Sequence, residues 1–309
     1  MRIIVFGLGF IATHLAIELS SMGEVLVTYR NLTPLKREYA SLLRNKAELV
    51  KIDPLTNDLG NIINGADAVV NAIGALSGDL RATHIEVPKL ITRAAVKAGA
   101  TLIHISASNA LGPRGSFVAE EEKHCEGAAP SNEYEYTKCE GEKVVYGEAM
   151  KGGIPFAIIR PTLVYGEYAA HGEWLLMYKA AKLGIIPKVR LSVSSISAAS
   201  LARMVRELIR VKPHGLYMYA TECGQVPIYR FMEIMSAALL RRVIKVPTPS
   251  FLAMLALPSS VRQLAKYAGV SYDCSKSREL IGELTFDEEQ VRRNALFLKR
   301  LEELRISGS

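Results

Sequence analysis

The sequence predicts an α/β protein with a doubly wound parallel sheet and a smaller C-terminal lobe. Short apolar segments alternate with helical stretches from residue 1 to about 165, and a glycine-rich turn joins the first of each. Strands that alternate with helices form right-handed crossovers, which build a parallel sheet covered by helices on both faces. After residue 166 the alternation loosens and prolines punctuate the chain, which predicts a second lobe.

Six segments have the length and composition of strands that are buried on both faces. They are short, rich in β-branched residues and nearly continuous in apolar character, and they lie at 2–6, 25–29, 48–52, 67–73, 101–106 and 155–160. Between them we expect helices at 10–22, 34–45, 84–98 and 132–151. Two further strands are expected near 189–193 and 215–220.

The composition of the chain restricts its partners. The 309 residues carry a formal net charge of +7, but the Lys and Arg are scattered and are not interleaved with aromatic residues. A groove for single-stranded nucleic acid would show that interleaving, so we expect no nucleic acid. A basic balance suits a small molecule that carries phosphate. The apolar run 251–257 is too short to span a bilayer, so we expect a core helix there and no membrane association.

The cysteines predict a reducing environment. Cys125, Cys139, Cys223 and Cys274 show no Cys-x-x-Cys spacing. This predicts free thiols in the cytoplasm and argues against a zinc site or a disulfide framework. We therefore expect no metal.

The turn after the first strand carries the strongest functional signal. In the segment VFGLGFIATHL, Gly7 permits a tight turn, Gly9 lets the backbone approach a pyrophosphate, and Ala12 allows close helix–strand packing. Phe10 and Ile11 open the helix, whose unpaired N–H groups would face the phosphates. A plain tight turn is the alternative. Its place between a strand and a helix favours a dinucleotide site on a Rossmann-type sheet.

The end of the second strand predicts which dinucleotide binds. An acidic residue there would bind the ribose 2′-hydroxyl, whereas Arg30 offers a guanidinium to a 2′-phosphate, and Asn31 follows it. We therefore expect NADP, with NAD as the alternative; the other explanation is a solvated arginine at a strand end. The ends of the third and fourth strands supply further expected cofactor contacts, namely Asp53, Pro54, Ala72, Ile73 and Gly74.

Three Tyr-x-x-x-Lys pairs are candidates for acid–base chemistry: Tyr134/Lys138, Tyr178/Lys182 and Tyr272/Lys276. On a helix, residues i and i+4 share one face, so Tyr134 meets Lys138 while Tyr136 points away. An ammonium group and an oxidised nicotinamide beside a phenol would lower its pKa and make it useful for exchanging a substrate's proton. The spacing alone does not choose among the pairs, and a solvated helix face is the alternative.

The order of the motifs resembles the extended short-chain dehydrogenase/reductases, the NAD(P)-dependent epimerase/dehydratase family. The resemblance covers nearly the whole chain, through the glycine turn, LIHISAS, Y-x-x-x-K-C-E-G-E and IIRPTLVYG at 158–166. It implies that the catalytic pair lies on the helix between the fifth and sixth strands, where only Tyr134 and Lys138 fall. Lys138 would also hold the nicotinamide ribose. The other two pairs would then be surface features.

The resemblance also implies a Ser or Thr that orients the substrate oxygen. Its expected place is Ala107, which is flanked by Ser106 and Ser108. We assign the orienting role to Ser108 and a cofactor contact to Ser106. Pro161 and Leu163, in the sixth-strand motif, are further expected cofactor contacts.

Two departures from the family concern the substrate. Nucleotide-sugar epimerases that resemble this chain have Asn in place of Leu163, and Asn-x-x-Gly-Thr where this chain has His84 followed by Val87 and Pro88. The segments VPKLITRAAVKAG and GEKVV are instead similar to the NADPH-binding accessory subunit of respiratory complex I. That relative is thought not to turn over substrate.

The sequence therefore predicts an NADP-dependent oxidoreductase or epimerase that transfers a hydride at a carbinol or carbonyl carbon, with a nucleotide sugar as one candidate substrate. The alternative is a non-catalytic NADP-binding structural or regulatory protein. Residues 1–166 with about 189–220 would bind the dinucleotide, and about 167–188 with 221–309 would bind a small-molecule substrate. The resemblance also implies a homodimer through the helices at 84–98 and 132–151.

Overall fold

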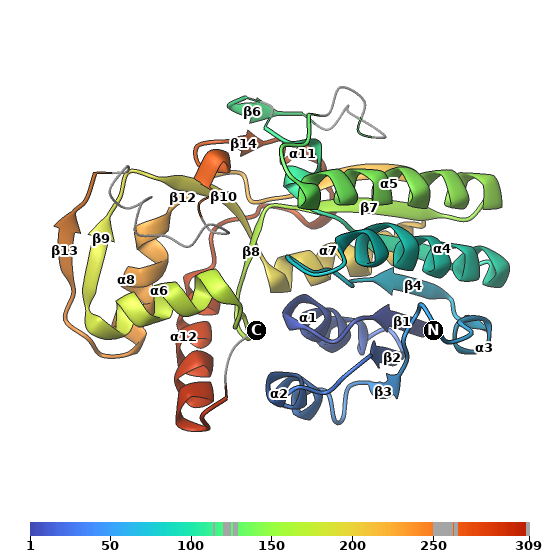
Figure 1. The fold of residues 1–309 in the computed structure, drawn as a ribbon, viewed down its shortest axis with the longest axis horizontal. Coiled ribbons are helices and arrows are strands. Elements are labelled where there is room, and N and C mark those ends of the chain that lie inside the picture. Colours follow the sequence, from blue (N-terminus) through green and yellow to red (C-terminus); the bar gives the residue numbers. More distant parts are fainter. Residues whose placement is uncertain (114, 120–124, 126–128, 250–261, 263–264, 307–309) are drawn as a thin grey trace.

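The computed structural model describes residues 1–113, 115–119, 125, 129–249, 262 and 265–306 (Figure 1). Its centre is a parallel sheet of seven strands, in the order β11 (His214–Ala220), β7 (Phe156–Pro161), β5 (Thr101–Ile105), β4 (Ala68–Asn71), β1 (Arg2–Phe6), β2 (Glu24–Tyr29) and β3 (Glu48–Lys51). The order reverses at β1, because the chain first builds outward through β2 and β3 and then returns through β4. This is the doubly wound Rossmann-type sheet that the sequence predicts, and the fold class is confirmed.

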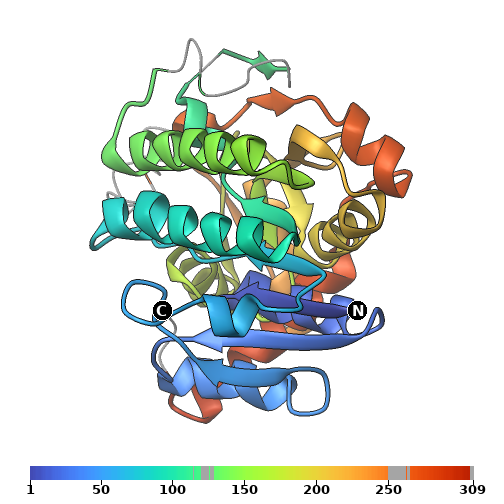
Figure 2. The same cartoon turned by 90° about the vertical axis from the view of Figure 1, so that its right-hand side faces the viewer.

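Helices cover both faces of this sheet. One layer contains α1 (Phe10–Leu19), α2 (Pro34–Leu42) and α7 (Ala198–Val211), and the other contains α3 (Gly60–Ile63), α4 (Val87–Ala98) and α5 (Glu133–Gly152). Alternate residues of β1 serve the two layers: Ile3 packs in the same core as Leu15 of α1, and Ile4 packs in the same core as Ile91 of α4. Figures 1 and 2 both show α4 and α5 side by side. The nearly continuous apolar strands follow from this double coverage.

The chain forms further elements, many of which lie on the left of Figure 1 and above the main sheet. They are η1 (Ala82–Glu86), η2 (Ser108–Leu111), β6 (Phe117–Val118), β8 (Leu163–Tyr165), α6 (Gly172–Leu183), β9 (Ile185–Lys188), β10 (Ser192–Ser197), β12 (Gln225–Pro227), α8 (Ile228–Ala238), β13 (Ile244–Pro247), η3 (Ala265–Tyr267), β14 (Ser271–Tyr272), α11 (Ser275–Ile281) and α12 (Glu288–Glu303). The strands among them form small sheets, in the orders β12-β10-β8, β13-β9 and β14-β6.

The expected elements differ from the observed ones mainly at their ends. The helix expected at 84–98 begins as the π-helical turn η1, and α4 continues from Val87. The strand expected near 189–193 is β10, which joins the small sheet with β8 and not the main sheet. The core helix expected at 251–257 lies outside the described residues. In the described part of the chain, no helix is long and apolar enough to cross a membrane.

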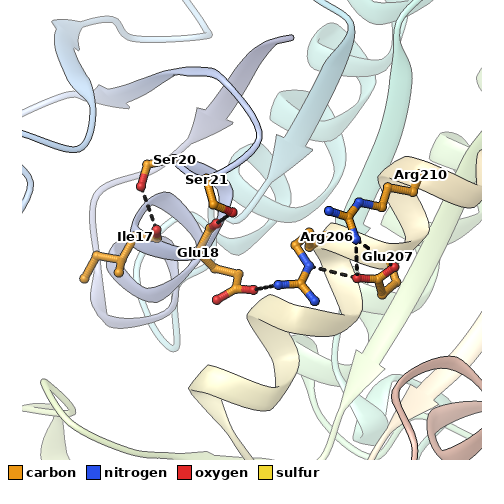
Figure 3. A network of polar contacts seen from close by, with 7 residues as sticks. All are labelled: Ile17, Glu18, Ser20, Ser21, Arg206, Glu207 and Arg210. Atoms are coloured by element: carbon orange, nitrogen blue, oxygen red, sulfur yellow. Dashed lines mark hydrogen bonds and ion pairs between the residues drawn. The ribbon is translucent and has the colours of Figure 1, made fainter.

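Helices α1 and α7 are joined by an ion pair on the outer side of their layer (Figure 3). Arg206 of α7 reaches Glu18 of α1 and also pairs with its neighbour Glu207. Glu207 in turn pairs with Arg210, one turn further along α7. This network joins α7 to α1, the helix that follows the glycine turn.

The expectation of free thiols was wrong. Cys125 is bonded to Cys139 and Cys223 to Cys274, so none of the four cysteines is free. The partners are 14 and 51 residues apart, and only the folded chain brings them together. The cysteine spacing therefore carried no information on the pairing.

Candidate active site

The glycine turn lies between the ends of β1 and β4. Gly7 has φ +108°, which L-residues rarely adopt, and a Cβ there would lie 3.3 Å from the carbonyl oxygen of Ala72 and from Ile73 Cγ1. Gly9, directly before α1, is different, because a Cβ there would meet no described atom within 4 Å. The turn is therefore packed against the end of β4 at Gly7, whereas the space beside Gly9 is free of described protein atoms. That shape suits a pyrophosphate at the helix N-terminus.

Two cations lie at the end of β2. Arg30 is exposed, and its charge lowers the pKa of Lys36 on α2, after the larger effect of burial. Thr33 caps α2 by accepting a hydrogen bond from the Lys36 N–H at 3.3 Å, which sets the first turn of this helix beside the strand end. Sequence reasoning identified Arg30 and the exposed Asn31 but missed Lys36, although Thr33–Pro34 is a clear helix start.

The end of β3 forms a compact turn. The carboxylate of Asp53 accepts a hydrogen bond from the Leu55 N–H at 3.1 Å, and the Asp53 N–H donates to Asn57 Oδ1 at 2.8 Å. Pro54 is buried in the same turn. Asp53 therefore shapes the backbone at the predicted adenine side.

The lysine of the predicted catalytic pair reaches the end of β4. Lys138 Nζ lies 3.6 Å from the position that a Cβ on Gly74 would take. The side chain is 5% exposed, and burial lowers the pKa of Lys138 to about 8 against the opposing charge of Glu142. Since Gly7 adjoins Ala72 and Ile73, the glycine turn, the end of β4 and Lys138 are neighbours in the fold.

The tyrosine of the pair is partly buried near the start of α5, whereas Tyr136 is 46% exposed. Burial, together with the smaller effect of the Glu173 and Glu135 carboxylates, raises the pKa of Tyr134 to about 12. We expected a lowered pKa from Lys138 and an oxidised nicotinamide. In the chain by itself the direction is the opposite, because burial and the two carboxylates dominate.

His84 is a site residue that sequence reasoning did not assign. Its Nδ1 donates to Thr137 Oγ1 at 2.9 Å, its Nε2 accepts from the Ala75 N–H at 3.3 Å, and its ring meets the Tyr134 ring edge-on at 5.3 Å. Burial and the Lys138 charge lower its pKa to about 3, so the imidazole is neutral. Gly141 permits this approach, since a Cβ there would lie 1.9 Å from the His84 carbonyl oxygen.

A buried ion pair fixes α5 to the sheet. Arg160 of β7 donates to Glu142 at 2.6 Å, and the two side chains are 1% and 0% exposed. The guanidinium also lies 4.7 Å from the ring centre of Tyr217 on β11. Because Glu142 follows Lys138 by one helical turn, this pair holds Lys138 in place.

The serines at the end of β5 have different surroundings. Ser106 Oγ is buried and has no hydrogen-bond partner among the described residues, as is true of His104 Nε2 on the same strand. Ser108 is partly exposed and shares a hydrogen bond with the hydroxyl of Tyr272. Ala107 separates the two serines and is itself buried.

The two other Tyr-x-x-x-Lys pairs are not surface features as expected. Tyr178 is 5% exposed, and its hydroxyl and Lys182 both bind Glu302 of α12. Tyr272 is 9% exposed, and Lys276 donates to the backbone of β11. Both pairs join secondary-structure elements, and Tyr272 also reaches the site through Ser108.

The sixth-strand motif leads from the sheet into the second part of the site. Pro161 is the buried last residue of β7, and Leu163 is partly buried at the start of β8. Helix α6 follows and carries Glu173, whose carboxylate is 3.0 Å from His171 Nε2. Among the described residues, no group of three or more His, Cys, Asp and Glu could hold a metal ion.

Known proteins resemble this chain in sequence and in fold. A model of the NAD dependent epimerase/dehydratase family matches residues 3–185. A UDP-N-acetyl-alpha-D-glucosaminuronate decarboxylase from Bacillus cytotoxicus is 26% identical over 193 residues, which cover 59% of this chain and 57% of the decarboxylase. The match thus spans less than two thirds of that enzyme.

Solved structures match over almost the full length. UDP-glucuronic acid 4-epimerase from Bacillus cereus, in complex with UDP-glucuronic acid and NAD, is 19% identical with a TM-score of 0.76, covering 97% of this chain and 100% of the epimerase. UDP-N-acetylglucosamine 4-epimerase from Methanobrevibacter ruminantium, in complex with UDP-N-acetylmuramic acid, is 18% identical with a TM-score of 0.76, covering 97% and 98%. At these identities the likeness establishes the fold.

Proposed function

Because the chain belongs to the NAD dependent epimerase/dehydratase family, we propose that it is an NADP-dependent epimerase or oxidoreductase that acts on a carbinol carbon of a nucleotide sugar. The activities of the relatives, which are epimerases and a decarboxylase of UDP-sugars, support the enzyme interpretation over the non-catalytic one. Leu163 and His84 replace the asparagines that the resemblance led us to expect, so the sugar contacts differ from those of nucleotide-sugar epimerases.

One observation carries the proposal: the glycine turn and the Tyr/Lys helix meet at the same edge of the sheet. Gly7 adjoins Ala72 and Ile73, and Gly74 adjoins Lys138 Nζ. Ligands of doubly wound sheets bind outside the carboxyl ends of the strands, where the strand order reverses. In this chain that place lies between β1 and β4 and also receives Lys138.

The residues fit a dinucleotide. The open side of Gly9 would receive the pyrophosphate, Arg30 and Lys36 would bind a ribose 2′-phosphate, and Lys138 would hold the nicotinamide ribose. Two neighbouring cations without an acidic residue at the strand end support NADP, although the Bacillus cereus epimerase is solved with NAD. A bound cofactor would supply the hydride acceptor or donor.

The remaining chemistry belongs to side chains at the start of α5 and the end of β5. Tyr134 would exchange a proton with the substrate oxygen. When the substrate is oxidised, the Tyr134 phenolate would accept the proton of the substrate hydroxyl, and the ammonium of Lys138 would stabilise that phenolate. The partly exposed hydroxyl of Ser108 supports its role in orienting that oxygen, while the buried Ser106 Oγ lies out of solvent contact. His84 would keep the Tyr134 ring in position.

A cofactor titration tests the proposal. Arg30→Asp removes a charge-assisted fork, which is worth roughly 1.5–3 kcal/mol, so the affinity for NADPH should fall about ten- to a hundredfold while that for NADH changes much less. Arg44→Asp, in the exposed turn after α2, is the matched control and should leave both affinities unchanged. Equal binding of NADPH and NADH by the unchanged protein would contradict the NADP assignment. Turnover is sought by NADPH absorbance with UDP-sugars, ketones and aldehydes.

We further propose that residues 1–166 and about 189–220 form the dinucleotide-binding domain, and that about 167–188 and 221–309 form the substrate lobe. A homodimer through α4 and α5 is also proposed from the family resemblance. The outer face of these helices carries Lys89, Arg93 and Lys143, so its contacts would be largely polar. The expected cytoplasmic location depended on free thiols, and because all four cysteines are paired we propose no compartment.

A further inference from the structure

A carboxylate at the start of α6 acts on the catalytic tyrosine, because the charge of Glu173 raises the pKa of Tyr134. Glu173 lies in the first turn of α6, and the next residue, Trp174, is fully buried and packs edge-on against Phe231 at 5.4 Å. The tryptophan therefore anchors the start of α6 in the core. A side chain next to such an anchor has a defined position.

The carboxylate is also held by a histidine that lies over the glycine turn. His171 Nε2 is 3.0 Å from Glu173 Oε1, with side chains 30% and 16% exposed. The His171 ring lies 6.0 Å from the ring of Phe10, the residue that follows Gly9. The ion pair is thus neither in the core nor free in solvent. Through the contact of His171 with Phe10, it lies beside the glycine turn.

Glu173 differs from the other groups around Tyr134. Glu135 is committed to structure, because it accepts hydrogen bonds from Ser131, Asn132 and Tyr267. Lys138 is buried and His84 is neutral. The carboxylate of Glu173 interacts with the His171 ring and accepts a hydrogen bond from its own backbone N–H, whereas an ionised carboxylate can accept about four hydrogen bonds. It therefore retains lone pairs for a ligand, and its charge is felt at the Tyr134 hydroxyl.

We propose that Glu173 is a specificity-determining residue that accepts a hydrogen bond from a sugar hydroxyl beside the reacting carbon and disfavours a carboxylate there. This inference rests on the proposed function and narrows its substrate to neutral nucleotide sugars. Two carboxylates in a partly buried site repel each other strongly, because the effective dielectric is far below that of water. The Bacillus cereus epimerase, by contrast, is solved with UDP-glucuronic acid.

The test compares UDP-glucose with UDP-glucuronic acid, which differ by a hydroxymethyl and a carboxylate group. Their binding to the full-length, NADP⁺-loaded protein is measured by calorimetry for the unchanged chain, for Glu173→Gln and for the exposed control Glu303→Gln. The amide keeps an oxygen for His171 and removes the charge. We expect the unchanged protein to prefer UDP-glucose, and Glu173→Gln to reduce that preference about tenfold. The control should retain the preference.

A second readout separates this inference from the proposed function. The phenolate absorbance of Tyr134 is titrated as the difference between each protein and its Tyr134→Phe counterpart, and Glu173→Gln should lower the phenol pKa by about one unit. A preference for UDP-glucuronic acid, or an unchanged phenol pKa in Glu173→Gln, would overturn the inference. If neither sugar bound, the nucleotide-sugar part of the proposed function would be wrong. The phenol titration would then show separately whether the charge of Glu173 acts on Tyr134.

Discussion

Replacing Tyr134 with phenylalanine removes one hydroxyl and keeps the ring that meets His84 edge-on at 5.3 Å. The pKa of Tyr134 is about 12, so roughly one molecule in 10⁵ carries a phenolate at pH 7 before the cofactor binds. The hydroxyl is therefore a proton donor at neutral pH. Phenylalanine cannot donate, and turnover should fall about 10²–10⁴-fold while the affinity for NADPH stays nearly unchanged.

The assay follows NADPH absorbance with the substrate found by the screen, together with a cofactor titration of each variant. Tyr136→Phe is the matched control, because Tyr136 lies two residues away on the same helix and is 46% exposed. It should keep its turnover. In the direction that oxidises the substrate, the rate should rise with pH, since the deprotonated phenol is required. Equal losses from the two substitutions would refute the assignment of Tyr134.

Two further predictions concern stability and assembly. Glu142→Gln leaves the buried Arg160 without its charge partner and should lower the free energy of unfolding by about 3 kcal/mol in urea titrations. Glu303→Gln breaks the exposed pair with Lys299 on α12 and should cost no more than about 1 kcal/mol; equal costs for the two would contradict the importance of burial. For the dimer, sedimentation at micromolar concentration should show twice the chain mass, and a strictly monomeric mass would argue against it.

The sequence by itself determined the layers of the fold. The alternation of short apolar strands with helices, and the change of period between them, are local properties that tertiary contacts did not override. They predicted the doubly wound sheet and all seven of its strands to within a few residues, including the strand near 215–220. The position of the glycine turn is local in the same sense, because Gly7 and Gly9 stand between a strand and a helix.

Only the tertiary structure decided which side chains meet at the site. Lys138 reaches Gly74, and Lys36 lies near Arg30. Neither pair has a spacing in the sequence that would predict the contact, as the i, i+4 spacing does on a helix. The same holds for the disulfide between Cys125 and Cys139, whose pairing spacing could not predict. The pKa of a group depends on its burial and on charges brought from other elements, so the sequence could supply the phenol of a catalytic pair but not the direction of its shift.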